Sequence, residues 1–157
     1  MTVNNSLFRI FCGDIAIRSL AITILLWFCL PASSDAAGQI VNLKAGQSVY
    51  RVELAVTPAQ RRQGLMYRQQ LDSGQGMLLV YPQPGDHRIW MKNMRIALHV
   101  FWIDDQFTVI SAQRLEPCIS SPCPVFSAPR AARFVLELGD YAHDLGVGDK
   151  VEGLAGL

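Results

Sequence analysis

The sequence predicts a mainly β fold, either a compact β-sandwich or a partly open β-barrel with one short α-helix. Seven or so short apolar runs have strand-like composition and are separated by turn residues. Only one segment carries a helix start signal, and no βαβ alternation or internal repeat is present. A chain of 157 residues with 50% hydrophobic and 17% charged residues suits one globular domain with an adequate core.

The first predicted strands lie at residues 40–43 and 49–56. In the second run Tyr50, Val52, Leu54 and Val56 alternate with polar residues, which is typical of a strand that is buried on one face. The run at 40–43 is shorter and precedes a turn at Ala45-Gly46, so we expect it at a sheet edge.

A helix start follows this strand. Thr57 is a good N-cap, Pro58 suits the first helical position, and Gln60 completes a capping box. We expect the helix to run through Met66, over two to three turns. Residues 77–81 then form a continuous apolar run that must be covered on both faces, and residues 82–86 have the composition of a turn.

Two apolar runs, 89–94 and 98–103, are predicted to be extended strands at the centre of the sheet. A hairpin at 104–106 leads into a strand at 107–112, and further strands are expected at 134–139 and 150–152. Residues 141–145 are expected to form one helical turn.

The N-terminal segment has the pattern of a secretory signal peptide. Arg9 and Arg18 precede an apolar run at 20–30, which is followed by Pro31 and small residues. The sequence therefore predicts a signal peptide over 1–36, a single β-rich domain over 37–157, and a periplasmic or secreted location. The alternative is an uncleaved signal anchor, which would be the protein's one link to a membrane.

Removal of this segment leaves Cys118 and Cys123 as the cysteines of the mature chain. A pair of cysteines in an exported protein indicates a disulfide, which would staple a proline-rich loop. A redox-active pair is the alternative, but the spacing is longer than the usual Cys-x-x-Cys, and no helix start marks either thiol.

The charge balance disfavours nucleic-acid binding. Lys and Arg number 14 and Asp and Glu number 13, giving a formal charge of +1, and no basic run occurs. The expected partner is a small-molecule ligand or an envelope protein.

Two motifs indicate a family. Gly-Leu-Met-Tyr-Arg at 64–68 and Trp-Met-Lys-Asn at 90–93 occur at the separation seen in domain-of-unknown-function family 192, which the chain resembles from about 49 to 151. The resemblance implies a small β-rich domain, often exported, without an established activity. This chain departs from the family pattern at Met94, where Thr is usual, and at His99, where an acidic residue is usual. The other matching positions are Arg61, Leu71, Gly76, Met77, Leu78, Leu98, Ile103, Asp104, Leu136, Glu137, Gly148 and Asp149.

The favoured function is non-catalytic binding of a small carbohydrate-like or anionic ligand, or an accessory role in the envelope. A Trp near Lys, Asn and Asp offers a flat apolar face with donors and acceptors. In an extended strand Trp90 and Lys92 share one face, whereas Met91 and Asn93 share the other. The candidate ligand-binding residues are Arg61, Arg68, Trp90, Lys92, Asn93, Asp104 and Glu137.

A structural alternative explains the same residues without a ligand. Arg68, Asp104 and Glu137 would then be paired charges that tie the helix to the sheet, and Trp90 would be a core residue.

A second alternative is a hydrolytic enzyme. Its candidate acids and bases are Glu53, His99, Asp104 and Glu137, but nothing in the sequence pairs any two of them across a cleft, as glycoside hydrolysis requires. We therefore assign no catalytic residue.

A third alternative is periplasmic copper(I) handling, because thioether and imidazole groups suit this soft ion. The residues that suggest it are Met66, Met77, His87, Met91, Met94 and His99. An extended strand would place Met91 and Met94 on opposite faces, where they could not chelate one ion. We assign no metal site and no cofactor on this basis.

Overall fold

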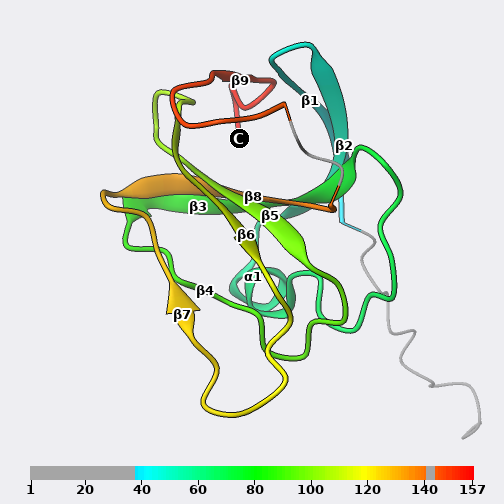
Figure 1. The fold of residues 1–157 in the computed structure, drawn as a ribbon. Coiled ribbons are helices and arrows are strands. Elements are labelled where there is room, and N and C mark those ends of the chain that lie inside the picture. The colour runs from blue at the N-terminus through cyan, green and yellow to red at the C-terminus, as the bar shows by residue number, and fades with distance from the viewer. Residues whose placement is uncertain (1–37, 141–143) are drawn as a thin grey trace, which may run out of the picture. The chain divides into compact units, whose positions relative to one another are not determined.

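The computed structural model describes residues 38–140 and 144–157. The predicted signal peptide at 1–36 lies outside the described residues, as do 141–143 of the predicted helical turn. The elements are β1 (Ile40–Ala45), β2 (Ser48–Ala55), α1 (Pro58–Gln63), β3 (Gln75–Gly85), β4 (Ile89–Trp90), β5 (Leu98–Ile103), β6 (Val109–Leu115), β7 (Val125–Phe126), β8 (Ala132–Leu138) and β9 (Val151–Glu152) (Figure 1).

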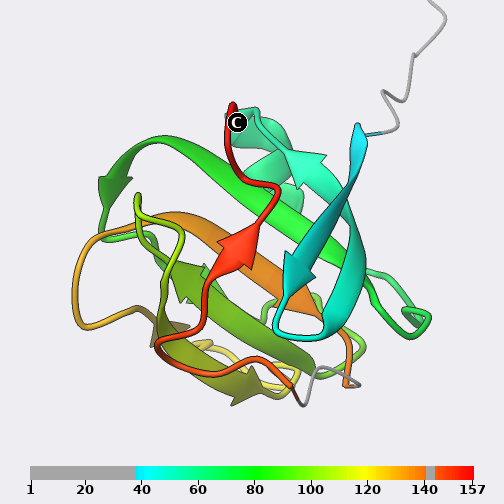
Figure 2. The same cartoon turned by 90° about the horizontal axis from the view of Figure 1, so that it is seen from above.

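Seven strands form one curled sheet in the order β6-β5-β8-β3-β2-β1-β9 (Figure 2). An isolated antiparallel bridge joins Thr108, beside β6, to Lys150, beside β9, so the two outer strands of the sheet approach each other. The Val151 N–H also donates to the Phe107 carbonyl at 2.9 Å. This half-barrel confirms the prediction of a mainly β fold with one short helix.

The sheet is covered on both faces, and each face has its own hydrophobic core. One core is closed by β9 and the C-terminal residues, with Leu78 and Leu136 among its members. The other core lies under α1 and the small β4–β7 pair, and it includes Leu79 and Val135 (Figure 1). Successive residues of β3 and β8 therefore enter different cores, which confirms that β3 is buried on both sides.

The capping box is confirmed, but the predicted length of the helix is wrong. The Gln60 N–H donates to Thr57 Oγ1 at 3.2 Å, and Gln60 Oε1 accepts from the Thr57 N–H at 2.9 Å. The helix ends at Gln63 rather than Met66, because Gly64 has φ 50° and ψ −136°, a conformation suited to glycine.

The prediction of a central strand over 89–94 is also wrong. Only Ile89 and Trp90 are extended, and they pair with β7 rather than with the large sheet. The chain then turns, and the Met94 N–H donates to the Met91 carbonyl at 3.3 Å. Asn93 takes φ 61°, a left-handed conformation that Asn tolerates better than most residues. Met91 and Met94 are consequently not held on opposite faces of a strand.

Three further features differ from expectation. β3 continues to Gly85, through the segment predicted as a turn; its ladder with β8 breaks after Val80 and resumes at Gly85, so the intervening Pro82 and Pro84 need not donate to it. β2 and β3 are parallel and joined through α1, which forms one βαβ unit that the sequence pattern did not predict. Val56 lies beyond β2 and is exposed.

Candidate functional site: a cavity over a buried glutamate

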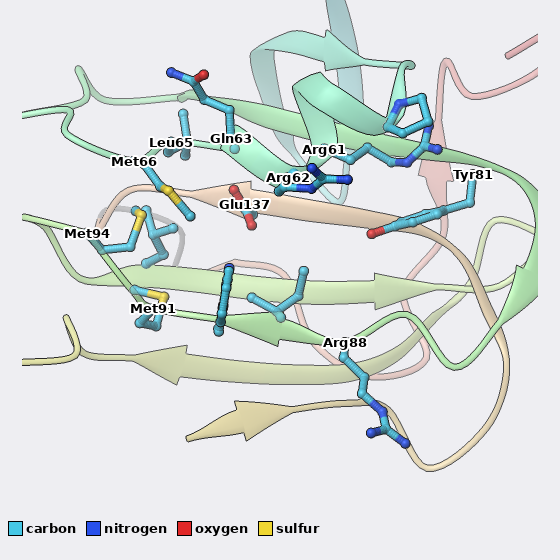
Figure 3. A pocket seen from close by; sticks show the side chains of 15 residues that line it. Arg61, Arg62, Gln63, Leu65, Met66, Tyr81, Arg88, Met91, Met94 and Glu137 are labelled. Carbon is cyan, nitrogen blue, oxygen red and sulfur yellow. The ribbon is translucent and has the colours of Figure 1, made fainter. Parts of the chain in front are cut away.

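A cavity of about 300 Å³ lies between α1 and the β4 segment, over the face of β8 that is turned towards α1 (Figure 3). Its walls combine three arginines, two aromatic rings and three methionines around a single acidic side chain. The lining residues are Pro58, Arg61, Arg62, Gln63, Gly64, Leu65, Met66, Tyr81, Arg88, Ile89, Trp90, Met91, Met94, Leu98 and Glu137.

Glu137 is the acidic group of this cavity, and it comes from the middle of the large sheet. In β8 it lies opposite Met77 of β3 and Val100 of β5, so its strand neighbours are apolar. The residue is only 5% exposed, and this burial raises the pKa of its carboxyl from 4.5 to about 7. Among the described residues, no hydrogen bond or ion pair reaches the carboxyl group. A buried acceptor is thus left facing the cavity.

Gly64 lies next to that carboxyl group. A Cβ atom built on Gly64 would lie 3.5 Å from Glu137 Oε2 and 4.0 Å from Oε1. These are ordinary contact distances, whereas the φ of 50° would strain any other residue there. The turn that ends α1, and not the space beside Glu137, therefore requires the glycine.

Arg61 and Tyr81 form one end of the cavity. Arg61 Nη1 donates to the Val56 carbonyl at 2.5 Å and to the Val80 carbonyl at 2.8 Å, and its guanidinium lies 4.8 Å from the Tyr81 ring centroid. Burial raises the pKa of Tyr81; Arg61 opposes this rise and the Glu137 carboxyl adds to it. The phenol stays protonated at neutral pH and points towards Glu137 (Figure 3).

The opposite end is formed by Met66, Met91 and Met94. Figure 3 shows Met66 and Met94 near each other and Met91 farther along the same side of the cavity, with Glu137 between them and the Tyr81 and Arg61 end. Asn93 Nδ2 lies 3.7 Å from the Met66 sulfur, and the Tyr67 N–H donates to the Asn93 carbonyl at 3.0 Å. These contacts hold the segment after α1 against the turn after β4.

Three of the predicted ligand-binding residues line the cavity: Arg61, Trp90 and Glu137. Trp90 is 43% exposed and is therefore not the core residue that the structural alternative required. Lys92 and Asn93 do not line the cavity themselves, but they adjoin it. Lys92 Nζ lies 5.4 Å from the Trp90 ring centroid.

Arg68 and Asp104 lie elsewhere and have partners of their own. Arg68 Nη2 is 2.7 Å from Glu53 Oε2, which ties the segment after α1 to β2. Asp104 Oδ1 accepts from the backbone N–H groups of Gln106 at 3.0 Å and Thr108 at 2.9 Å, and Arg130 approaches its other oxygen at 3.2 Å. Paired charges thus explain Arg68 and Asp104, but neither pairs with Glu137.

The residues proposed for hydrolysis or for metal binding are also dispersed. Glu53, His99 and Asp104 do not line the cavity, and His99 Nε2 lies 3.4 Å from Asp140 Oδ1 at the surface end of β8. His87 stacks on Tyr81 with ring centroids 3.4 Å apart and is not part of the lining. Within 38–140 and 144–157, no group of three or more His, Cys, Asp or Glu side chains could hold a metal ion.

Sequence reasoning missed Tyr81, Arg62, Arg88 and Gly64 as residues of one cavity. The sequence feature that could have indicated this cavity is Glu137, a lone acidic residue within the apolar run of β8. Its position next to α1 depends on strand order, which local patterns do not reveal.

The predicted disulfide between Cys118 and Cys123 is confirmed, with an S–S distance of 2.10 Å and a Cα–Cα distance of 5.7 Å. Among the helices of the described segments, none has the length and apolar character needed to span a membrane.

Comparison with known proteins places the chain in a family. A crystal structure from Sinorhizobium meliloti 1021, named "a putative transcription regulator", matches with 27% identity and a TM-score of 0.66 over 75% of this chain and 96% of that one. A protein of unknown function from Novosphingobium aromaticivorans DSM 12444 matches with 29% identity and a TM-score of 0.65 over 78% of this chain and 89% of that one. A search of curated proteins found no match. The sequence pattern of the uncharacterized ACR family DUF192 matches residues 40–153, and the chain therefore belongs to DUF192.

Proposed function

We propose that this protein is an exported, non-catalytic binding domain whose cavity takes a small polyhydroxylated ligand that carries an acidic group. The observation that carries the proposal is the Glu137 carboxyl, which is buried, faces the cavity and has no partner among the described residues. A buried polar group of this kind is costly unless a ligand or water satisfies it. Ligand hydroxyls are suitable donors to it.

The walls of the cavity suit the rest of such a ligand. Trp90 offers a partly exposed aromatic face, and Tyr81 offers a hydroxyl that can donate or accept. Arg62 adds positive charge to the lining, which favours an anionic substituent, whereas Arg88 is already paired with Asp86 at 2.8 Å. Arg61 Nη1 donates to two backbone carbonyls and its guanidinium lies over the Tyr81 ring, so Arg61 helps to position Tyr81.

Glu137 is the single acidic residue of the lining, which disfavours hydrolysis by a carboxylate pair. The near-balance of 14 basic and 13 acidic residues likewise disfavours nucleic acid as the partner, despite the name given to the Sinorhizobium relative. The disulfide is compatible with export, which supports an envelope role.

A thermal-shift screen of the purified protein against neutral sugars, sugar acids and hydroxy acids tests the proposal. A ligand that binds only the folded state adds about 2.7 kcal/mol at a hundredfold excess over its dissociation constant. We expect a sugar acid to raise the melting temperature of the wild type, with the shift lost in Glu137→Gln and Trp90→Ala.

Glu152→Gln is the matched control, because Glu152 lies in β9 and outside the cavity. A shift that is equal in Glu137→Gln and in the wild type would overturn the proposal, and so would the absence of any shift across the screen.

A further inference from the structure

The sulfur end of the cavity brings together three methionines from two segments. Met66 follows α1, whereas Met91 and Met94 belong to the turn after β4. The contact between Asn93 Nδ2 and the Met66 sulfur joins these segments, and the bond from the Met94 N–H to the Met91 carbonyl closes the turn. All three residues line the side of the cavity opposite Tyr81, with Met66 and Met94 near each other in Figure 3.

These methionines differ from an ordinary core methionine of the same protein. Met77 is buried in β3, packs in the core below α1 and does not line the cavity. Met66, Met91 and Met94 all contribute to the cavity wall, although Met91 is otherwise buried. Met91 belongs to the same core as Met77, and Met94 packs against that core, so core filling accounts for part of their role. Unlike Met77, however, Met66, Met91 and Met94 also line one cavity.

Thioether sulfur is a soft, uncharged donor that selects soft monovalent ions such as copper(I) over harder divalent ions. A buried cation also needs nearby negative charge or dipoles. The Glu137 carboxyl faces the same cavity, and in its ionised form it supplies negative charge without serving as a ligand. An extended strand would place Met91 and Met94 on opposite faces, but β4 ends at Trp90 and both residues line one cavity.

We infer that Met66, Met91 and Met94 form a three-thioether site for one soft monovalent cation of the copper(I) class, at the end of the cavity opposite Tyr81. This inference goes beyond the proposed function, because it concerns a metal ion and uses other side chains than Trp90 and Tyr81. An ion at this site would lie beside an organic ligand bound at the polar end.

Silver(I) is the appropriate probe, because it needs no reductant and so leaves the Cys118–Cys123 disulfide intact. Titration of the full chain, followed by isothermal calorimetry and by X-ray absorption at the silver edge, measures affinity and sulfur ligation. We expect one tightly bound ion per chain with sulfur neighbours. The triple variant Met66→Leu, Met91→Leu, Met94→Leu should bind at least tenfold more weakly.

Met77→Leu is the matched control and should bind like the wild type, since Met77 does not line the cavity. Leucine nearly conserves the volume of methionine, and circular dichroism would verify that each variant is folded. Unchanged affinity in the triple variant, an absence of binding to the wild type, or a shell of nitrogen and oxygen would overturn the inference.

The Glu137→Gln variant separates this inference from the proposed function. It should lose the sugar-acid shift, whereas silver(I) should bind more weakly but keep its sulfur neighbours, because the charge is removed and the thioethers remain. If Glu137→Gln loses only the sugar-acid shift, the inference of a metal site is unaffected. If the triple variant loses only silver(I) binding, the proposed organic-ligand site is unaffected.

Discussion

The Cys118 N–H donates to the Met91 carbonyl at 3.0 Å, so the loop closed by the disulfide is hydrogen-bonded to the wall of the cavity. The chain leaving that loop makes a second attachment, because β7 pairs with β4 and places Val125 opposite Trp90. The turn that carries Met91 and Met94 is therefore held from outside by the segment around the disulfide.

Loss of the disulfide should loosen this wall. We expect Cys118→Ser with Cys123→Ser to lower the free energy of unfolding by about 2 kcal/mol, the chain-entropy estimate for a short loop. Trp90 fluorescence should also shift towards that of a more exposed indole, because β7 covers part of its segment. Chemical denaturation followed by tryptophan emission measures both effects. Unchanged emission in the native baseline would show that the loop does not support the wall.

Glu137 should make the protein less stable as the pH rises. Below its ordinary pKa of 4.5 the carboxyl is protonated in both folded and unfolded states. Between 4.5 and about 7 the unfolded state ionises while the folded state keeps its proton, so the folded state is progressively disfavoured. The total loss is about 3 kcal/mol, and it levels off above pH 7.

The variant Glu137→Gln removes this loss. We expect it to match the wild type at pH 4 and to exceed its unfolding free energy at pH 8, measured by denaturant melts at both values. Glu152→Gln, at an exposed residue, is the control for a general effect of removing one carboxylate. Equal pH profiles for Glu137→Gln and the wild type would contradict the assignment of the raised pKa to Glu137.

Arg61 and Arg68 should differ in their contribution to stability, although both follow β2 closely. Arg61→Ala leaves the Val56 and Val80 carbonyls without this donor and removes the guanidinium over Tyr81, so we expect a loss of about 2 kcal/mol. Arg68→Ala removes a partly exposed ion pair with Glu53 and should cost less than about 1 kcal/mol. Thermal melts of the two variants side by side decide the order, and a reversed order would refute this account of Arg61.

Asp104 should act on folding and not on ligand binding. Its side chain satisfies two backbone N–H groups in the turn before β6, and Asp104→Ala should cost about 2 kcal/mol. Because Asp104 does not line the cavity, silver(I) and sugar-acid binding should remain as in the wild type once the variant is folded. A binding defect in the folded variant would restore Asp104 as a site residue.

Much of the fold follows from the sequence alone, because those features depend on short-range chemistry. The alternation of Tyr50, Val52 and Leu54 marks one buried face of β2, and the Thr57–Gln60 capping box marks the start of α1. The spacing of Cys118 and Cys123 indicated their bridge, and two short motifs indicated the family.

The tertiary structure decided which of these elements meet. Nothing local shows that β8 lies between β3 and β5, yet this order carries Glu137 beneath α1 and beside Gly64. Likewise, apolar composition at 89–94 favours a strand, but the bond from Tyr67 to Asn93 and the pairing of β4 with β7 make it a turn at the cavity wall. Local sequence sets backbone preferences of about 1 kcal/mol per residue, whereas contacts between distant segments together outweigh them and assemble the site.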